Sequence, residues 1–582
     1  MSKGTPGAAL FVKLGLLLLL AIVVPVTVSA AGRGEESEMI TLDAYTQLAN
    51  TSGYQPGWYA ALLEDLFNVR LNIIPDNEGV YETRVESGDL GDIIAWGSNG
   101  SEYQNAVALG LLFDWEEDDL VRTYGPNIWE NAQNALESNR EISGDGHVYG
   151  VGGALARSTE GHQSFFYTWD VRWDLYEALG HPEVTDLDSY LDLMIRMKEI
   201  NPTDLQGNET YAVSLWPDWD GTMVMYPKAF ATAYYGYDEM TIGLYDTETG
   251  RLYGALERGG PYLTALRFFN QLYQNDLVDP DSATQTYDQV SEKLRNGGVF
   301  FSIFNFSGSM GFNTQDNMEA GMMMLPLVPS EARVPTYGMS VLGSNRIWSI
   351  GSESSYPELC MEILNYLFSP DGAMTIWYGL PELHWYYDED GYTHLTELGQ
   401  LCNDDSQYDL AGVEWVSPYT GNSYLLGANF VDGMLAINNL TWARDAVNPD
   451  SNGETFNSDF WRSQQRPPRN EMEADWREFT DAVGAEEYME MRDYAVIPGT
   501  SYAESVRSDE LEVTWRQVTT AIKNFSWRAI YAESDEEFDR IVDTMIRLCN
   551  EYGYQEVLEW SENEAAIRHQ MELDLRETEG SR

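Results

Sequence analysis

Cysteine is scarce in this sequence, since only Cys360, Cys402 and Cys549 occur among 582 residues. An odd number without a CxxC pair excludes a disulfide-stapled framework and a cysteine-based zinc site. We therefore expect packing to stabilise the fold. Because Cys360 and Cys549 lie on apolar stripes at helical spacing, we interpret both as small buried hydrophobes.

Basic residues are scarce as well. The chain has 34 Lys+Arg, only six of them Lys, against 94 Asp+Glu, which gives a formal net charge of −60. Such a surface repels phosphate backbones and anionic headgroups, so no nucleic acid is expected as a partner. Disordered acidic chains have few aromatic residues, whereas this one carries 18 Trp, 36 Tyr and 20 Phe. The sequence thus predicts a folded protein whose surface suits a demanding extracellular medium.

A long apolar run occurs only at residues 14–28, behind Lys3 and Lys13. The run is shorter than the roughly 20 residues that span a bilayer. Ser29, Ala30 and Ala31 follow it, as small residues do at a signal-peptidase site. We predict a cleaved signal peptide at residues 1–30 and an extracellular or periplasmic protein; the alternative is an uncleaved membrane anchor. No cysteine stands near the cleavage point, so no lipid anchor is expected.

Catalytic motifs are lacking too. The sequence has no HExxH, no P-loop, no GxSxG and no glycine fingerprint after a strand, and its six His never pair at ligand spacing. We therefore expect no metal site, no cofactor and no Ser/His catalysis. Paired carboxylates for glycoside cleavage cannot be recognised among 94 acids, because so many acids produce any spacing by chance.

Apolar periodicity predicts alternating strands and helices near the start of the chain and mainly helices later. Strands at 39–42, 69–73 and 92–96, with a helix at 58–68, indicate a βαβ sheet. The expected helix starts are Thr185 with Asp188 as a capping box, Pro261, Pro357, and Ser534 with Glu537.

Aromatic side chains gather in loop-like stretches. Trp216 and Trp219 bracket Pro217-Asp218, and residues 384–387 read HWYY. Flat apolar rings beside carboxylates and amides suit sugars, whose CH faces pack on rings while their hydroxyl groups take fixed hydrogen bonds. These clusters favour sugar binding, although a single ring is more often part of a core.

Several short motifs follow one another in a fixed order. Residues 87–94 read SGDLGDII, residues 145–150 read DGHVYG, and residues 378–385 read YGLPELHW. The other motifs are 108–112, 172–174 with Gly180, 265–280, 296–300, 356–368 and 538–558. Taken in order, they resemble the extracellular solute-binding proteins of ABC importers, in the large sugar- and oligosaccharide-binding branch. The resemblance covers about residues 40 to 560.

Two stretches depart from the pattern of that family. Pro381-Glu382 stand where the family has Glu-Gly, which alters the expected loop. Residues 201–209 (NPTDLQGNE) occupy a loop that is an Asp/Asn-rich calcium site in some relatives. Thr203, Leu205 and Gln206 weaken that ligand set, so we expect no tight calcium binding.

The resemblance implies an α/β fold of two lobes, each a mixed sheet flanked by helices, with a ligand cleft between them. Lobe 1 would use residues 38–152 plus 312–368, and lobe 2 residues 153–311 plus 369–560, before a charged tail at 561–582. The implied protein is a monomer and not an enzyme, captures a sugar by hinge closure and delivers it to membrane permease subunits. The alternatives are a secreted carbohydrate-active enzyme and a glycan-binding protein without a transporter.

By the same analogy, ligand contacts are expected from loops that follow the strands at the cleft edge. The expected residues are Trp96, Asn99, Arg172, Trp216, Trp219, Asn305, His384 and Trp385. Arg172 would either hydrogen-bond hydroxyl groups or a uronate, or form a structural salt bridge. Because a strongly anionic glycan would need such a local Arg, a neutral oligosaccharide is the expected ligand.

Overall fold

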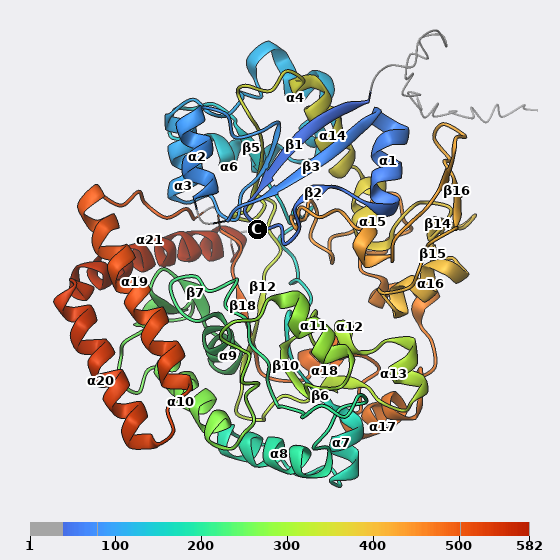
Figure 1. Ribbon diagram of the computed structural model, residues 1–582. Coiled ribbons are helices and arrows are strands. Elements are labelled where there is room, and N and C mark those ends of the chain that lie inside the picture. The colour runs from blue at the N-terminus through green and yellow to red at the C-terminus, as the bar shows by residue number, and fades with distance from the viewer. Residues whose placement is uncertain (1–38, 78, 501, 581–582) are drawn as a thin grey trace, which may run out of the picture. The chain divides into compact units, whose positions relative to one another are not determined.

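A six-stranded sheet in the order β2-β3-β1-β4-β13-β5 organises the first part of the chain (Figure 1). The computed structural model describes residues 39–77, 79–500 and 502–580, the last six by their backbone alone. The strands are β1 (Ile40–Thr46), β2 (Gly53–Tyr54), β3 (Val69–Pro75), β4 (Ile93–Ala95), β5 (Gly150–Gly152) and β13 (Ile347–Ile350). β1, β3 and β4 are parallel, and Thr46 is in register with both Pro75 and Ala95. Three carboxyl ends therefore lie together, at what we call the carboxyl edge.

Alternation along β1 explains why both faces of this sheet are covered. Leu42 and Ala44 enter one buried cluster, whereas Tyr45 enters another on the opposite face, as the two-residue period of a strand requires. The covering helices are α1 (Gly57–Phe67), α2 (Val80–Ser87), α3 (Ser101–Ala108), α4 (Leu120–Tyr124), α5 (Pro126–Asn131), α6 (Gln133–Ser143), α14 (Pro357–Leu367) and α15 (Pro370–Tyr378). Beside them lie α16 (Glu397–Asp404) and two hairpins, β14 (Trp385–Tyr387) with β15 (Thr393–Leu395) and β16 (Glu414–Val416) with β17 (Ser423–Leu425).

A second set of sheets is built around β6 (Tyr167–Arg172), which pairs antiparallel with β10 (Phe301–Phe304) and β11 (Met324–Pro326). A three-stranded sheet holds β7 (Asp238–Met240), β8 (Gly243–Asp246) and β9 (Arg251–Gly254), and β12 (Val334–Tyr337) pairs parallel with β18 (Tyr494–Ile497). The helices here are α7 (Trp173–Ala178), α8 (Leu187–Ile200), α9 (Met225–Tyr235), α10 (Pro261–Gln274), α11 (Tyr287–Arg295), α12 (Ser309–Phe312), α13 (Gln315–Glu319), α17 (Glu471–Thr480), α18 (Ala485–Glu490), α19 (Asp509–Ile530), α20 (Asp535–Glu551) and α21 (Tyr554–Gly580).

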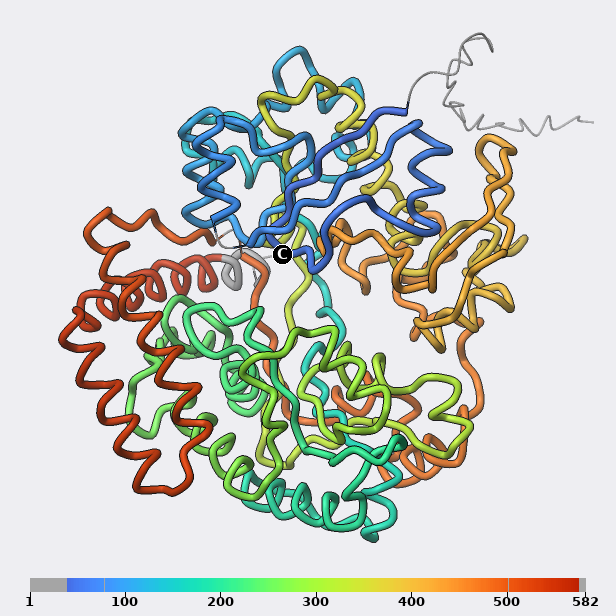
Figure 2. Tube along the Cα trace, viewed as in Figure 1, coloured from blue at the N-terminus to red at the C-terminus, as the bar shows by residue number. Residues whose placement is uncertain are grey.

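The helices and strands pack around two large clusters of buried side chains. One contains side chains between Leu42 and Ala156 and between Met339 and Trp461; the other contains side chains at 165–334 and 476–557. The chain passes between them after Ala156, after Val334 and after Trp461, and these passages can be followed in Figure 2. From Ile40 onward the chain clusters as one compact unit, so the predicted lobe boundaries stay a prediction.

Helix starts follow local sequence signals closely. Pro261 and Pro357 occupy the first turns of α10 and α14, and Ser534 accepts a hydrogen bond from the Glu537 amide at the start of α20, as predicted. The capping box of α8 lies one residue later than predicted, at Asp186 with Ser189, because the Asp186 carboxylate accepts from the Ser189 amide at 2.9 Å. Cys360 and Cys549 are fully buried, which confirms their interpretation.

The last helix, α21, includes most of the segment that the sequence predicts to be a charged tail. Ala565 and Glu572 are buried on it. Arg568 Nη2 donates to Asp238 Oδ2 at 2.7 Å, and its Nε donates to Glu572 Oε1 at 3.0 Å. Tyr245 O–H donates to Glu572 Oε2 at 2.8 Å. Partners far away in the sequence thus hold the charges of this helix against the sheet of β7, β8 and β9.

The predicted signal peptide at residues 1–30 lies outside the described residues. Among the helices that the structure describes, none is both long and apolar enough to cross a bilayer.

Arg568→Met is expected to lower the free energy of unfolding by about 3 kcal/mol, because Asp238 and Glu572 would keep buried charges without their cation. Urea denaturation followed by circular dichroism measures this. The matched control is Arg547→Met on α20, where the exposed pair with Glu551 at 2.8 Å should be worth about 0.5 kcal/mol or less. Equal losses in the two variants would show that the Arg568 network does not stabilise α21.

Candidate functional site

The carboxyl edge of the first sheet carries a row of amide and carboxyl groups. Gln47, directly after β1, accepts from the Gly97 amide at 2.8 Å and donates to the Glu102 carboxylate. Asp76 follows β3, and burial raises the pKa of both Asp76 and Glu102. In a sheet of this kind ligands bind outside the carboxyl ends of the strands. The carboxyl edge therefore presents groups that can form hydrogen bonds with a ligand.

Aromatic rings gather on the second set of sheets, where four chain segments meet. We call this the ring cluster, and its members are Phe166 before β6, Phe304 and Phe306 at the end of β10, Tyr287 at the start of α11, and Trp216 and Trp219 in the loop before α9. Trp219 lies 4.9 Å from Tyr287 and 5.9 Å from Phe306 between ring centroids. Phe306 in turn stacks on Phe166 at 5.5 Å.

The ring cluster runs from the core to the surface. Trp216 is fully buried, Trp219, Tyr287 and Phe306 are half-buried, and Phe166 is 41% exposed. The pairing of β10 with β6 shifts register between Ser302 and Phe304, and such irregularities re-aim side chains at the end of a strand. Exposed ring faces of this kind pack on the CH faces of sugars.

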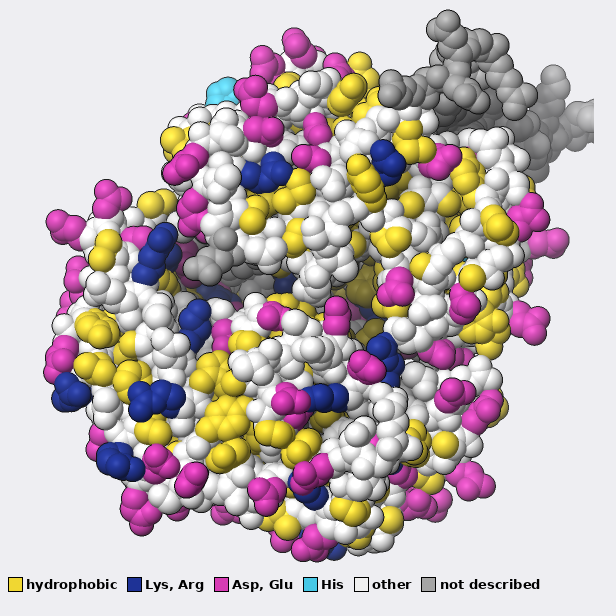
Figure 3. Space-filling view, in the orientation of Figure 1, with side chains coloured by type: hydrophobic (Ala, Val, Ile, Leu, Met, Phe, Trp, Pro, Cys, Tyr) yellow, Lys and Arg dark blue, Asp and Glu magenta, His cyan; other side chains and the backbone are white. Residues whose placement is uncertain are grey.

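Hydrogen bonds join the ring cluster side to the carboxyl edge. Trp219 Nε1 donates to Asn50 Oδ1, in the loop after β1, at 3.2 Å. Farther along, Asn99 Nδ2 donates to the Tyr502 carbonyl at 3.5 Å, and Gln104 Nε2 donates to the Glu504 carbonyl at 3.0 Å. Figure 3 shows the surface recessed between the first sheet above and α11 and α12 below, with acidic side chains spread over the visible face.

Four of the predicted site residues lie in this region, among them the buried Trp216 of the ring cluster. Trp219 belongs to the ring cluster, Asn305 precedes Phe306 and donates to the Phe165 carbonyl at 3.2 Å, and Asn99 lies after β4. Tyr287 and Phe166 were missed by sequence reasoning. Their signal was weak, because Phe166 stands in a run of aromatic residues, Phe165 to Tyr167, of the kind that a buried strand carries, and Tyr287 is a single aromatic residue at the start of a helix.

The other predicted residues have packing roles. Trp96 Nε1 donates to Ser349 Oγ at 3.1 Å, and Trp385 Nε1 donates to the Gly379 carbonyl at 2.8 Å, so both indoles are held inside the fold. His384 Nδ1 accepts from the Leu380 amide at 2.9 Å, and burial lowers its pKa to about 4. The expected ligand contacts of these buried rings stay a prediction.

Arg172 was expected either to bind the ligand or to form a structural salt bridge, and the structure shows the salt bridge. Its Nε and Nη2 donate to the two carboxylate oxygens of Asp174 at 2.8 and 2.6 Å, and the side chain is almost fully buried. Trp216, in contrast, leaves a polar atom unpaired. Its Nε1 is buried and has no hydrogen-bond partner among the described residues. Such a donor costs free energy unless a ligand or water satisfies it.

The loop at 201–209 is held by its own hydrogen bonds. Asp204 Oδ1 accepts from the amides of Gln206 and Asn208, both at 2.8 Å, and Glu209 pairs with Lys198 at 2.9 Å. Within the part of the chain that the structure describes, no group of three or more His, Cys, Asp or Glu is placed to hold a metal ion.

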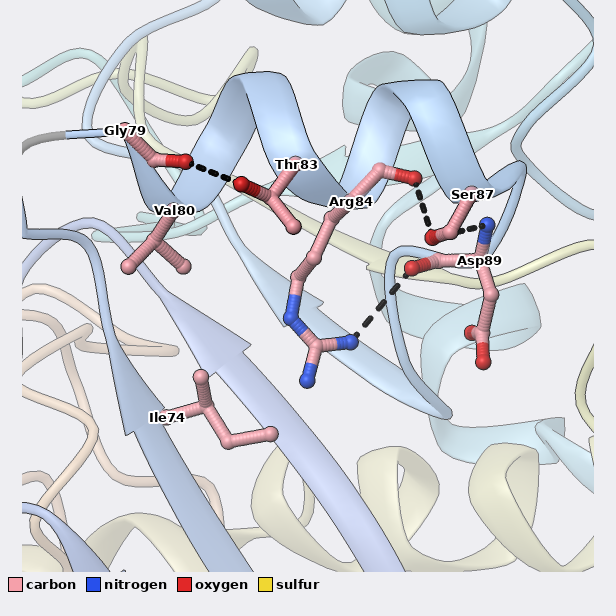
Figure 4. A pocket seen from close by; sticks show the side chains of 7 residues that line it. All are labelled: Ile74, Gly79, Val80, Thr83, Arg84, Ser87 and Asp89. Atoms are coloured by element: carbon pink, nitrogen blue, oxygen red, sulfur yellow. Dashed lines mark hydrogen bonds between the residues drawn. The ribbon is translucent and has the colours of Figure 1, made fainter.

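A cavity of about 560 Å³ lies elsewhere, beneath α2. Figure 4 shows Arg84 reaching from α2 toward Asp89, whose carbonyl accepts from Arg84 Nη1 at 3.4 Å, with Ile74 and Val80 beside it. None of the predicted site residues and no member of the ring cluster lines this cavity. It is therefore separate from the candidate site.

Two carboxylates hold the chain where it first passes between the buried clusters. The Ser164 amide donates to Asp445 Oδ2 at 2.5 Å, and the Phe165 amide donates to Glu486 Oε1 at 3.1 Å. Asn457 Nδ2 also donates to Asp445, at 2.7 Å. Burial, together with the charges of Asp445 and Asp459, raises the pKa of Glu486 to about 8. The hydrogen bond from the Phe165 amide to Glu486 therefore involves a carboxyl group that changes its protonation near neutral pH.

No family model and no curated protein matches the chain. Solved structures match its fold, and each of the following aligns with 91% of this chain and 99% of its own length. The alginate-binding protein AlgQ2, solved without calcium ion, is 15% identical with a TM-score of 0.57. The ABC-transporter substrate binding protein FusA of S. pneumoniae, solved with kestose, is 16% identical with a TM-score of 0.54. The N-glycan transport solute binding protein NgtS of Streptococcus pneumoniae is 14% identical with a TM-score of 0.52.

These similarities establish the fold. The chain has the two-lobed α/β architecture of the ABC-transporter solute-binding proteins for sugars and oligosaccharides, as the order of its motifs predicted.

Glu486→Gln is expected to gain stability relative to the wild type as pH rises from 5 to 8. A Glu with a raised pKa keeps its proton in the folded state while the unfolded state loses it above about pH 4.5, so the wild type is destabilised across this window. Gln keeps an acceptor for the Phe165 amide and removes the loss. We expect a gain of about 1–2 kcal/mol in urea denaturation, reduced from the full shift because the group is partly solvated.

The control for this measurement is Glu478→Gln on α17, an exposed position. Its stability difference from the wild type should be the same at both pH values. A Glu486→Gln difference that also stays constant with pH would show that Glu486 is ionised in the folded state.

Proposed function

We propose that this chain is the exported substrate-binding component of an ABC-type carbohydrate importer. The observation that carries the proposal is the ring cluster opposite the carboxyl edge, with Trp219 hydrogen-bonded to Asn50 across the recess. Proteins with this fold support it, because they include an alginate-binding protein, a substrate binding protein solved with kestose and an N-glycan transport solute binding protein. A sugar ring would stack on the half-buried rings while the amides after β1 and β4 bind its hydroxyl groups.

In this proposal the two buried clusters are the cores of two lobes, and the ligand lies between them. Packing favours placing 312–334 with the lobe of β6 and 369–461 with the lobe of β1. The passages at 156–165 and 334–339 would act as hinges. Closure would be a population shift driven by the preference of the ligand for the closed form, and permease subunits would recognise that form. The protein would act as a monomer without catalysis.

Trp219→Ala is expected to lower the affinity for the bound oligosaccharide about tenfold or more, because a central ring contact typically contributes at least 1.4 kcal/mol. The ligand is first found by a thermal-shift screen of the mature protein against a glycan panel, since a ligand of the folded state raises its melting temperature. Isothermal titration calorimetry then gives the affinities.

Tyr552→Ala serves as the control, since this ring is 43% exposed at the end of α20. It should leave the affinity unchanged. Unchanged affinity for Trp219→Ala would place the binding site elsewhere, and release of shorter sugars from an oligosaccharide during incubation would favour the carbohydrate-active enzyme instead.

A further inference from the structure

Trp219 lies at the tip of a tight turn in the loop before α9. The Asp220 amide donates to the Pro217 carbonyl at 3.0 Å, which closes a four-residue β-turn with Trp219 in its third position. The chain enters this turn from Trp216 and leaves it toward Val224, and both of these side chains are buried. The direction of the Trp219 ring therefore depends on how firmly the two ends of the turn are held.

The first end of the turn is anchored to the segment before α11. Gln285 Nε2 donates to the Leu215 carbonyl at 2.7 Å, and the Leu215 amide donates to Ser282 Oγ at 3.0 Å. The ring of Trp216 packs against that of Tyr287 at 5.1 Å between centroids. These contacts fix the main chain before the turn, so the other end must be held by different groups.

The carboxylate of Asp220, the residue directly after Trp219, holds the second end of the turn. Its Oδ1 accepts at 2.7 Å from the amide of Met225, the first residue of α9. Its Oδ2 accepts at 2.7 Å from Trp527 Nε1 on α19, 307 positions away in the sequence. One side chain thus ties the turn to two helices.

A carboxylate suits this position better than an amide does. Both partners are N–H donors, and each donates to its own oxygen atom of Asp220. Asparagine has one acceptor oxygen and an NH₂ group that only donates, so one of the two donors would face another N–H group. A donor that is kept from water without an acceptor costs free energy, and turning residue 220 away would relieve that cost by rotating the turn.

The contacts of Trp219 show what such a rotation would disturb. Its ring lies 4.9 Å from that of Tyr287 and 5.9 Å from that of Phe306, and its Nε1 donates to Asn50 Oδ1 at 3.2 Å. All three partners belong to other segments of the chain. A ring that is already held in its binding orientation loses less conformational entropy when a ligand binds.

We propose that Asp220 is a positioning residue of the binding site, which holds the turn at 217–220 so that Trp219 presents its ring to the sugar. This inference rests on the proposed function and concerns how the site is held ready, not which sugar it takes. Asp220 itself touches no ligand and acts through Trp219. The effect of changing Asp220 on affinity should therefore vanish once the Trp219 ring is removed.

The test titrates one glycan into a set of variants of the mature protein by calorimetry. The probe is whichever of maltotriose, cellotriose, xylotriose, mannotriose, kestose and trimannuronate raises the melting temperature of the wild type most. Asp220→Asn is expected to lower the affinity about fivefold, because the loop is no longer held before binding. In the background of Trp219→Ala, the same change should alter the affinity by less than about twofold.

A second variant tests the pairing of donors with acceptors. Trp527→Phe keeps a ring on α19 and removes its N–H group, so the single oxygen of an asparagine at position 220 would suffice for the Met225 amide. The double variant of Asp220→Asn with Trp527→Phe should therefore bind the probe as tightly as Trp527→Phe alone. This comparison applies even where Asp220→Asn by itself is too unstable to purify.

Asp246→Asn is the matched control, since Asp246 is also half-buried and also accepts with both oxygen atoms. Its partners are the Glu248 amide at 2.9 Å and Thr249 Oγ1 at 2.6 Å, in the turn between β8 and β9. That turn contains no member of the ring cluster, so the affinity should stay unchanged.

Full affinity in Asp220→Asn overturns the inference. A loss that persists in the Trp219→Ala background, or one that Trp527→Phe does not reverse, overturns it as well. Each of these results leaves the proposed function standing, because the wild type still binds the probe. If the wild type binds none of the glycans, the proposed function itself fails.

Discussion

The two amides of Ser164 and Phe165, and the two carboxylates that hold them, are the constraint on which the rest of the arrangement depends. A chain that leaves one core for another must satisfy its backbone hydrogen bonds outside any sheet. Here Asp445 comes from the cluster that contains the first sheet, and Glu486 comes from α18 beside the other cluster. One carboxylate from each side thus fixes consecutive residues of the same passage. The ring cluster begins at the very next residue, Phe166.

Local signals in the sequence were sufficient for much of the fold. Proline at the first turn of α10 and α14 and serine before α20 act within a few residues, so they could be predicted without knowing the fold. The capping box of α8 moved by one residue because Thr185 and Asp186 can both cap, and only the geometry at Ser189 decides between them. The order of motifs predicted the fold class, since it reflects the order of whole elements.

The site was harder to predict, because exposure of a ring depends on residues that are distant in sequence. Trp96 looks like a ligand contact, but Tyr45, Tyr81 and Tyr103 pack around its indole within 6.3 Å. Trp216 and Trp219 lie three residues apart in one loop, and yet Trp216 is fully buried whereas Trp219 is half-buried beside Tyr287. No local pattern distinguishes the two tryptophans. The same reasoning explains Glu486, whose pKa depends on Asp445, 41 positions earlier in the numbering.

The excess of acidic residues supports a more specific conclusion when the partner of each charged side chain is known. In the sequence it is a single number, and that number favours a neutral ligand. In the structure most arginines near the cores form ion pairs with carboxylates, as Arg568 does with Asp238 and Glu572. Each such pair removes one positive charge from the groups that a ligand can reach.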